Sequence, residues 1–167
     1  MAELTQKERL QPSLLDRLTD DAPTSHVESR EDRVIGVQRL RECVLRDLAW
    51  LLNTENAESV IDLTDYPELQ KSVINFGIPV TAGLTASGIQ LHVLENRVKN
   101  AILTFEPRIL KDTLQVQGLS SSEMMNRKTL VFEIRGELWA QPVPLRLYLR
   151  TELDLETGSA SIQSANK

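Results

Sequence analysis

The stretch Phe105-Glu106-Pro107-Arg108-Ile109 separates a part of the chain with helical periodicity from a part with strand periodicity. Pro107 has a fixed φ and no N–H to donate, and it disfavours helical angles at Glu106, so a helix should end near Phe105. Glu106 and Arg108 then lie two apart in an extended segment, where alternate side chains point the same way. One interpretation is a helix stop with two solvated charges. The other is a rigid polar clamp, in which the acid orients the planar arginine fork or accepts a partner's donors.

Two amphipathic helices are predicted before this corner. The first should run from about Arg30 to Leu52, and the second from about Ser87 or Gly88 to Thr104. In both, apolar residues recur at spacings of 3, 4, 4 and 3, which places them on one stripe. We expect the two helices to be neighbours because the stripes match; residues 66–77 form a further short helix in this prediction. The stripes are Val37, Leu40, Val44, Leu48 and Leu51, and Leu91, Leu94, Val98, Ile102 and Phe105.

After the corner the hydrophobic period changes to two, which is typical of half-buried strands. Strands are expected within residues 110–119, 129–139 and 145–155, the last being the clearest because leucines alternate there with charged residues and a tyrosine. Residues 159–167 are small and polar, and form either a weak edge strand or a free tail. The fold class predicted is α+β, with long amphipathic helices packed on one face of a small, mainly antiparallel sheet of about three or four strands.

The predicted domain organisation has three parts. Residues 1–28 form a flexible N-terminal segment, residues 29–158 a single α+β domain, and residues 159–167 a polar tail. The first segment contains Leu14, Leu15 and Leu18 at helical spacing, with Ser13 as a possible cap. A turn this short is not stable alone. It is either a flap packed on its own domain or a recognition helix that binds a partner.

Composition excludes several classes of protein. The 167 residues carry a formal charge of −5 and contain no basic block, which argues against nucleic acid as a main partner. No apolar run approaches the roughly 20 residues that span a bilayer, and the N-terminus has no signal-peptide pattern. Cys43 is the single cysteine, so an internal disulfide and a Cys-based zinc site are excluded. These features fit a reducing, cytoplasmic setting.

Catalytic motifs are missing from the sequence. It has no G-x-S-x-G, no phosphate-binding glycine loop and no H-E-x-x-H, and one cysteine with two histidines is poor material for nucleophilic catalysis. Paired carboxylates could in principle cleave glycosides. However, Glu133, Glu137, Glu152 and Asp154 alternate with basic residues on a predicted wet face, which is typical of cross-strand surface pairs. We therefore expect no catalytic, cofactor-binding or metal-binding residues, and no enzyme.

Four motifs in order resemble the TssE family, the type VI secretion system baseplate subunit related to the sheath-initiating wedge protein of contractile phage tails. They are Leu14-Leu15-Asp16-Arg17-Leu18, Ser72-Val73-Ile74-Asn75-Phe76-Gly77-Ile78-Pro79, Phe105-Glu106-Pro107-Arg108-Ile109 and Glu133-Ile134-Arg135-Gly136-Glu137-Leu138-Trp139, followed by the strand ending Leu149-Arg150-Thr151-Glu152-Leu153-Asp154-Leu155-Glu156-Thr157-Gly158. One departure is Pro79-Val80-Thr81-Ala82-Gly83, where an acidic residue after the proline would be expected.

This resemblance implies a non-enzymatic structural role in the baseplate wedge, at the cytoplasmic side of the inner membrane and without direct membrane insertion. The implied partners are the baseplate subunits TssF, TssG and TssK and the sheath subunits TssB/TssC. Glu106, Pro107 and Arg108 would hold the TssF/TssG bundle, and Leu14, Leu15 and Leu18 would add partner contacts.

The sheet would template the first sheath ring by accepting an extended sheath arm, on the edge of either the 145–155 strand or the 110–119 strand. Two alternatives to this role remain. One is a lysozyme-like peptidoglycan glycoside hydrolase, and the other is a small cytoplasmic regulator that binds one adaptor protein.

Overall fold

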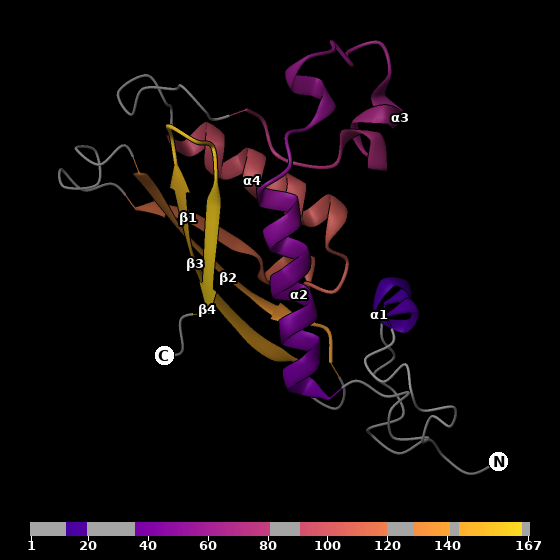
Figure 1. The fold of residues 1–167 in the computed structure, drawn as a ribbon, viewed down its shortest axis with the longest axis vertical. Helices are drawn as coiled ribbons and strands as arrows, with labels where there is room; N and C mark the ends of the chain where they lie inside the picture. Colours follow the sequence, from indigo (N-terminus) through magenta and orange to yellow (C-terminus); the bar gives the residue numbers. More distant parts are fainter. Residues whose placement is uncertain (1–12, 20–35, 81–90, 120–128, 141–143, 165–167) are drawn as a thin grey trace.

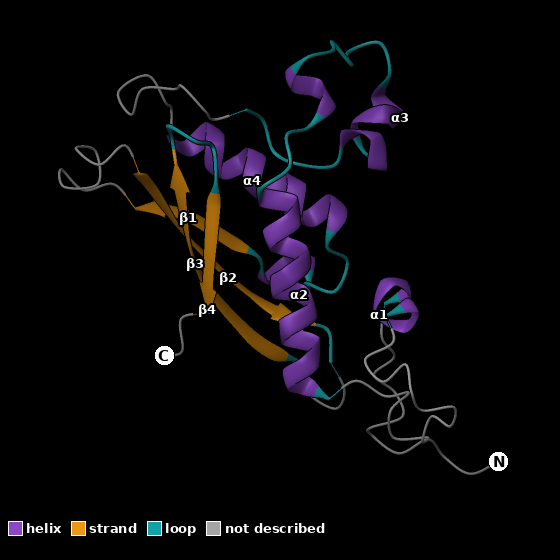
Figure 2. Ribbon diagram, viewed as in Figure 1, coloured by secondary structure: helices purple, strands orange, loops and turns teal. Residues whose placement is uncertain are grey.

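Two long helices cover one face of a sheet in the computed structural model, which describes residues 13–19, 36–80, 91–119, 129–140 and 144–164 (Figure 1). Along the chain the helices come first and the strands follow (Figure 2). The helices are α1 (Leu14–Leu18), α2 (Val37–Leu52), α3 (Pro67–Gln70) and α4 (Leu91–Phe105), with 3-10 turns η2 (Ala57–Ser59), η3 (Val73–Asn75) and η4 (Lys111–Thr113). The strands are β1 (Gln115–Leu119), β2 (Thr129–Leu138), β3 (Leu145–Asp154) and β4 (Ala160–Ser164).

The strands of the described residues form one sheet in the order β1-β2-β3-β4, and each neighbouring pair is antiparallel. The α+β prediction is therefore confirmed. The alternation in β2 and β3 is confirmed too, because the leucine-rich face is buried and the charged face is largely accessible. On that outer face Glu133 lies opposite Arg150, and Glu137 lies opposite Arg146, as expected for cross-strand charge pairs.

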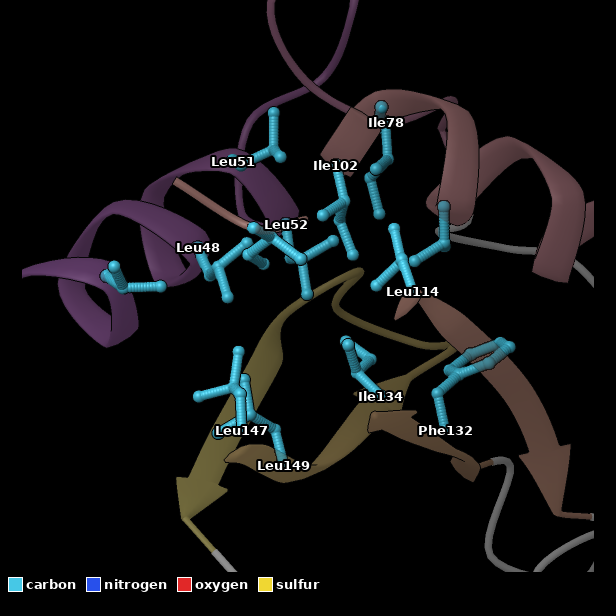
Figure 3. Packing of buried hydrophobic residues seen from close by; sticks show 14 of the residues in the cluster. Leu48, Leu51, Leu52, Ile78, Ile102, Leu114, Phe132, Ile134, Leu147 and Leu149 are labelled. Carbon is cyan, nitrogen blue, oxygen red and sulfur yellow. The ribbon is translucent and has the colours of Figure 1, made fainter. Parts of the chain in front are cut away.

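The core lies between the helices and the sheet (Figure 3). Both predicted stripes face it, and α2 and α4 are neighbours, as predicted. Val37 is an exception, since it is exposed in the first turn of α2. The expected helix start near Arg30 is wrong, because Gly36 has an extended backbone and precedes the first helical residue. The buried residues that Figure 3 labels are Leu48, Leu51, Leu52, Ile78, Ile102, Leu114, Phe132, Ile134, Leu147 and Leu149.

Of the predictions about the sheet edges, one is wrong and one is confirmed. The 145–155 strand is not an edge, since β3 pairs with β2 on one side and β4 on the other. Of the two alternatives for residues 159–167, the weak edge strand is confirmed, because residues 160–164 form β4 at the edge of the sheet. The small side chains of β4 allow pairing although they bury little. The strand expected from residue 110 begins at Gln115, because η4 precedes it.

The segment predicted as one short helix over residues 66–77 is interrupted. The Ser72 hydroxyl accepts the N–H of Ile74, which ends α3 and starts η3. Gly77 then has a φ of 127°, and a Cβ there would lie 2.3 Å from the carbonyl oxygen of Thr54. Only glycine fits this close crossing. The turn places the Phe76 ring edge-on against Phe105, with ring centres 5.2 Å apart, at the end of α4.

None of the helices in the described ranges has the length and apolar character that crossing a membrane requires.

Candidate functional site

The corner after α4 is braced from within. Glu106 is only 3% exposed, and its backbone N–H continues the helix by donating to Ile102 at 2.8 Å. Its carboxylate faces forward along the chain, where Oε1 accepts the backbone N–H of Arg108 at 3.1 Å and Nε of Arg108 at 2.7 Å, while Oε2 accepts Nη2 of Arg108. Pro107 stands between them, exposed at the tip. The acid therefore orients the arginine fork, as the clamp interpretation predicted.

Arg108 connects this corner to α2 and to the end of β2. Its Nη2 donates to Oδ2 of Asp47 on α2 at 2.5 Å, and its carbonyl accepts the N–H of Trp139 at the end of β2 at 2.7 Å. Burial alone would lower the pKa of Arg108, but the hydrogen bonds and charges of Glu106 and Asp47 raise it above its usual value. The guanidinium is therefore permanently charged and joins the corner to α2, while the backbone carbonyl of Arg108 joins the corner to the end of β2.

The interpretation of Glu106 and Arg108 as two solvated charges is wrong. The reason is tertiary: Asp47 and the end of β2 enclose the corner from sides that the local sequence does not reveal. Contact of Glu106, Pro107 and Arg108 with a partner stays a prediction.

A groove of about 480 Å³ runs alongside the corner, and most of its surface is apolar. Trp50 of α2 and Trp139 after β2 are about half exposed at this groove. Within the described residues, Nη1 of Arg108 is buried and has no hydrogen-bond partner. The remaining lining residues are Ser13, Leu15, Leu40, Asp47, Leu48, Leu51, Phe76, Phe105, Glu106 and Pro107.

The short helix α1 lies on the side of α2 away from the strands (Figure 1). Ser13 caps it, as predicted, by accepting the N–H of Asp16. Leu15 lines the groove, whereas Leu14 and Leu18 are exposed to solvent by 72% and 74%. The structure thus brings one of the three predicted leucines to the corner and leaves the other two facing outward.

Sequence reasoning missed Asp47, Trp50 and Trp139. The helical periodicity of residues 30–52 places Asp47 off the apolar stripe, and it gives no sign of a partner 61 residues further along the chain. The tryptophans carried one usable signal: both are large apolar residues at positions that the periodicity places off the buried stripe of the helix or off the buried face of the strand. Exposed aromatic side chains beside a groove are typical of protein-binding surfaces.

Within the described ranges no group of three or more His, Cys, Asp or Glu side chains could hold a metal ion. The arrangement supplies a stiff polar brace, an apolar groove and exposed aromatic rings, which together suit the binding of another protein surface.

The fold is that of an α+β domain with an apolar groove beside a braced charged corner. The family model for baseplate wedge protein gp25 matches residues 38–143, which include the corner, Asp47 and both tryptophans. The match spans well over half of the chain, and the chain therefore belongs to the gp25 baseplate wedge family. The expected relationship to a baseplate wedge protein is confirmed. The helix α1 and the strands β3 and β4 lie outside the matched residues.

A solved structure gives a weaker likeness. The chain is similar to a crystal structure from Geobacter sulfurreducens that bears a provisional tail-lysozyme name, with 18% sequence identity and a TM-score of 0.45. The alignment covers 80% of this chain and 96% of the other. Among curated proteins, none matches this chain.

Proposed function

We propose that this chain is a non-enzymatic structural subunit of a type VI secretion baseplate wedge, with the role of TssE. In this role it holds the TssF/TssG bundle, lies near TssK at the cytoplasmic side of the inner membrane, and starts the TssB/TssC sheath. Membership of the baseplate wedge family supports the structural part of this proposal. The observation that carries the rest is the braced corner beside an apolar groove with exposed tryptophans.

The corner groove is the docking surface for the bundle in this proposal. Glu106 is buried and fully engaged with Arg108, so it shapes the surface rather than touching the partner. The groups available to a partner are the tip of Pro107 and the rings of Trp50 and Trp139, whereas Nη1 of Arg108 is buried. A bundle helix could place apolar side chains in the groove against the two tryptophans, while Arg108 sets the shape of the corner.

Mixing the purified chain with a TssF/TssG complex tests this surface. Arg108→Lys keeps the positive charge but removes the planar fork, so we expect the bundle to bind about tenfold or more weakly. Bundle binding at wild-type affinity by Arg108→Lys, together with folded Trp50→Ala and Trp139→Ala variants that also bind normally, would remove the groove from the proposal.

The two edges of the sheet bear on the proposed role of this chain in starting the sheath. On β1, the Gly118 N–H donates outward to Oε1 of Glu95 at 2.6 Å, so this edge position is already occupied. Side chains on antiparallel strands alternate, and so do the outward-facing backbone groups. The next outward position within β1 is therefore Val116 alone. Helix α4 also packs against β1, and Leu91 lies directly over Gly118.

The β4 edge has more open backbone. The Asn53 side chain donates to the Ala160 carbonyl at 2.9 Å and accepts the Ala160 N–H at 2.9 Å, which imitates a paired strand at that position. The backbone N–H and C=O groups of Ile162 and Ser164 point outward from the sheet edge, as those of Ala160 do. Two successive outward residues can pair with an incoming strand, whereas the single one on β1 gives a shorter ladder. We therefore assign the sheath arm to β4, beyond Ala160.

Hydrolysis of peptidoglycan is the function class that contradicts this proposal. The folded chain, incubated with purified peptidoglycan, should release no soluble fragments above a buffer control. Release of fragments that depends on a named carboxylate would replace the structural role with a glycoside hydrolase.

A further inference from the structure

Helix α1 contacts the domain through the carboxylate of Asp16 rather than through the side chains of Leu14 and Leu18. Asp16 has a side chain only 5% exposed, while Leu14 and Leu18 face solvent. Docking driven by apolar burial would give the reverse pattern, with leucines inside and the carboxylate outside. The helix therefore lies on α2 because of one polar contact point.

The polar contact is an ion pair between Asp16 and Arg46, and Ser13 adds a hydrogen bond to Asp16. Asp16 Oδ1 lies 2.8 Å from Nη2 of Arg46 on α2, and Asp16 Oδ2 accepts the Ser13 hydroxyl at 2.5 Å. Burial would raise the pKa of Asp16, but hydrogen bonds from Ser13, Arg46 and Cys43 lower it to about 2. The carboxylate is thus charged across the whole neutral range and holds its partners throughout.

Arg46 extends this contact to the corner. Its Nε donates to Oδ1 of Asp47 at 2.9 Å, and the other oxygen of Asp47 accepts Arg108. A chain of alternating charges therefore runs from α1 through α2 to the corner. With α1 held by these contacts, Ser13 and Leu15 line one side of the groove, whose volume is about 480 Å³.

We propose that Asp16 is a polar latch that holds α1 in place as one wall of the corner groove, so that a partner in the groove also meets Leu14 and Leu18. The helix is a wall and not a lid, because the groove is open while α1 is docked. The latch itself stands on the contacts of Asp16, whereas its effect on a partner rests on the function proposed above.

Cys43 gives a direct readout of the latch. It is the single cysteine of the chain, 2% exposed, and it contacts Asp16 rather than belonging to the cluster between the helices and the sheet. Burial and the Asp16 charge both raise the pKa of its thiol. Release of α1 should therefore expose Cys43 to a thiol reagent while the domain stays folded.

The test compares Asp16→Asn and Asp16→Ala with wild type in the full chain. The matched control is Glu42→Gln, which removes a carboxylate at half-exposed Glu42 beside Cys43 without touching α1. We expect Ellman's reagent to label Cys43 about tenfold faster in both Asp16 variants, after each rate is corrected for the thiolate fraction from that variant's own pH–rate profile, because the loss of a charge-assisted hydrogen bond shifts local opening by that order. Circular dichroism should show an unchanged fold, and the control should label at the wild-type rate.

Unchanged labelling in both folded Asp16 variants would overturn the latch. Faster labelling combined with wild-type affinity for a TssF/TssG complex, or with tighter binding, would overturn the role of α1 as a groove wall; tighter binding would make it a lid. Faster labelling with about tenfold weaker binding supports the proposal. If the wild-type chain does not bind the TssF/TssG complex, the function proposed above is wrong, and so is the role of α1 as a groove wall. The labelling result still decides whether Asp16 is a latch.

Discussion

The guanidinium of Arg108 and the carboxylate of Asp47 meet at 2.5 Å, although 61 residues separate them in the chain. This pair joins the corner after α4 to the middle of α2. Because Glu106 holds the same guanidinium from the other side, the corner is part of the framework of the domain and not an appendage on its surface.

Glu106→Ala should destabilise the domain strongly. It leaves the partly buried Arg108 with one acidic partner in place of two, and removal of one member of a buried ion pair typically costs about 3–5 kcal/mol. The free energy of unfolding, measured in urea, checks this. Glu42→Gln, in an exposed pair on α2, should change stability by less than about 1 kcal/mol. Equal stability of both variants would restore the view of Glu106 as a surface charge.

Trp139→Ala should separate binding from stability. The ring is about half exposed, so we expect a loss of unfolding free energy within about 1 kcal/mol. Affinity for a TssF/TssG complex should fall by about 2 kcal/mol or more, the range of aromatic hot spots. Calorimetric titration with the bundle measures the second quantity. Val60→Ala is the matched control, since Val60 is exposed and lies outside the groove.

Ile162→Pro should block sheath initiation while the wedge still assembles. Proline removes the outward N–H of this β4 position and leaves the inward ladder to β3 in place. Val116→Pro makes the same change on β1 and should leave sheath assembly normal. Electron microscopy of reconstituted baseplates with sheath subunits provides the readout. A sheath that forms on the Ile162→Pro variant but not on the Val116→Pro variant would move the incoming arm to β1.

Gly77→Ala should destabilise the domain without touching the groove residues. The new Cβ would meet the Thr54 carbonyl oxygen at 2.3 Å, and the φ of 127° is strained for any L side chain. Backbone strain of this kind costs about 1–3 kcal/mol before the clash is counted. A thermal melt checks the effect, with Gly36→Ala as control, because a Cβ at Gly36 meets nothing within 4 Å. Identical melting of the two variants would contradict the close crossing.

Acid should release α1 only at very low pH. The folded-state pKa of Asp16 is depressed from 3.8 to about 2, so its stabilising contribution is complete above the unfolded value and is lost as the pH falls through the folded one. Cys43 labelled with dithiodipyridine, which reacts in acid, should stay protected at about pH 4 and become accessible towards pH 2. Exposure of Cys43 already at pH 5 in a folded chain would contradict this assignment.

The sequence by itself determined the order and type of the main elements. Leucine and valine at helical spacing produced α2 and α4, and strict alternation produced β2 and β3, because burial of one face sets those periods locally. The position of Pro107 fixed the end of α4 within one residue. The motif resemblance also predicted the family, since motifs in a fixed order are a property of the chain alone.

Only the tertiary structure decided which of these residues form the site. Asp47 and Trp139 approach Arg108 from distant parts of the chain, so no local pattern could show that the charged corner is enclosed. The edges of the sheet were also beyond the sequence, because β4 gains its strand pairing from β3 and not from hydrophobic alternation of its own. Burial depends on what packs against a residue from elsewhere in the chain, and the same reason explains why Asp16 is buried while the leucines beside it are exposed.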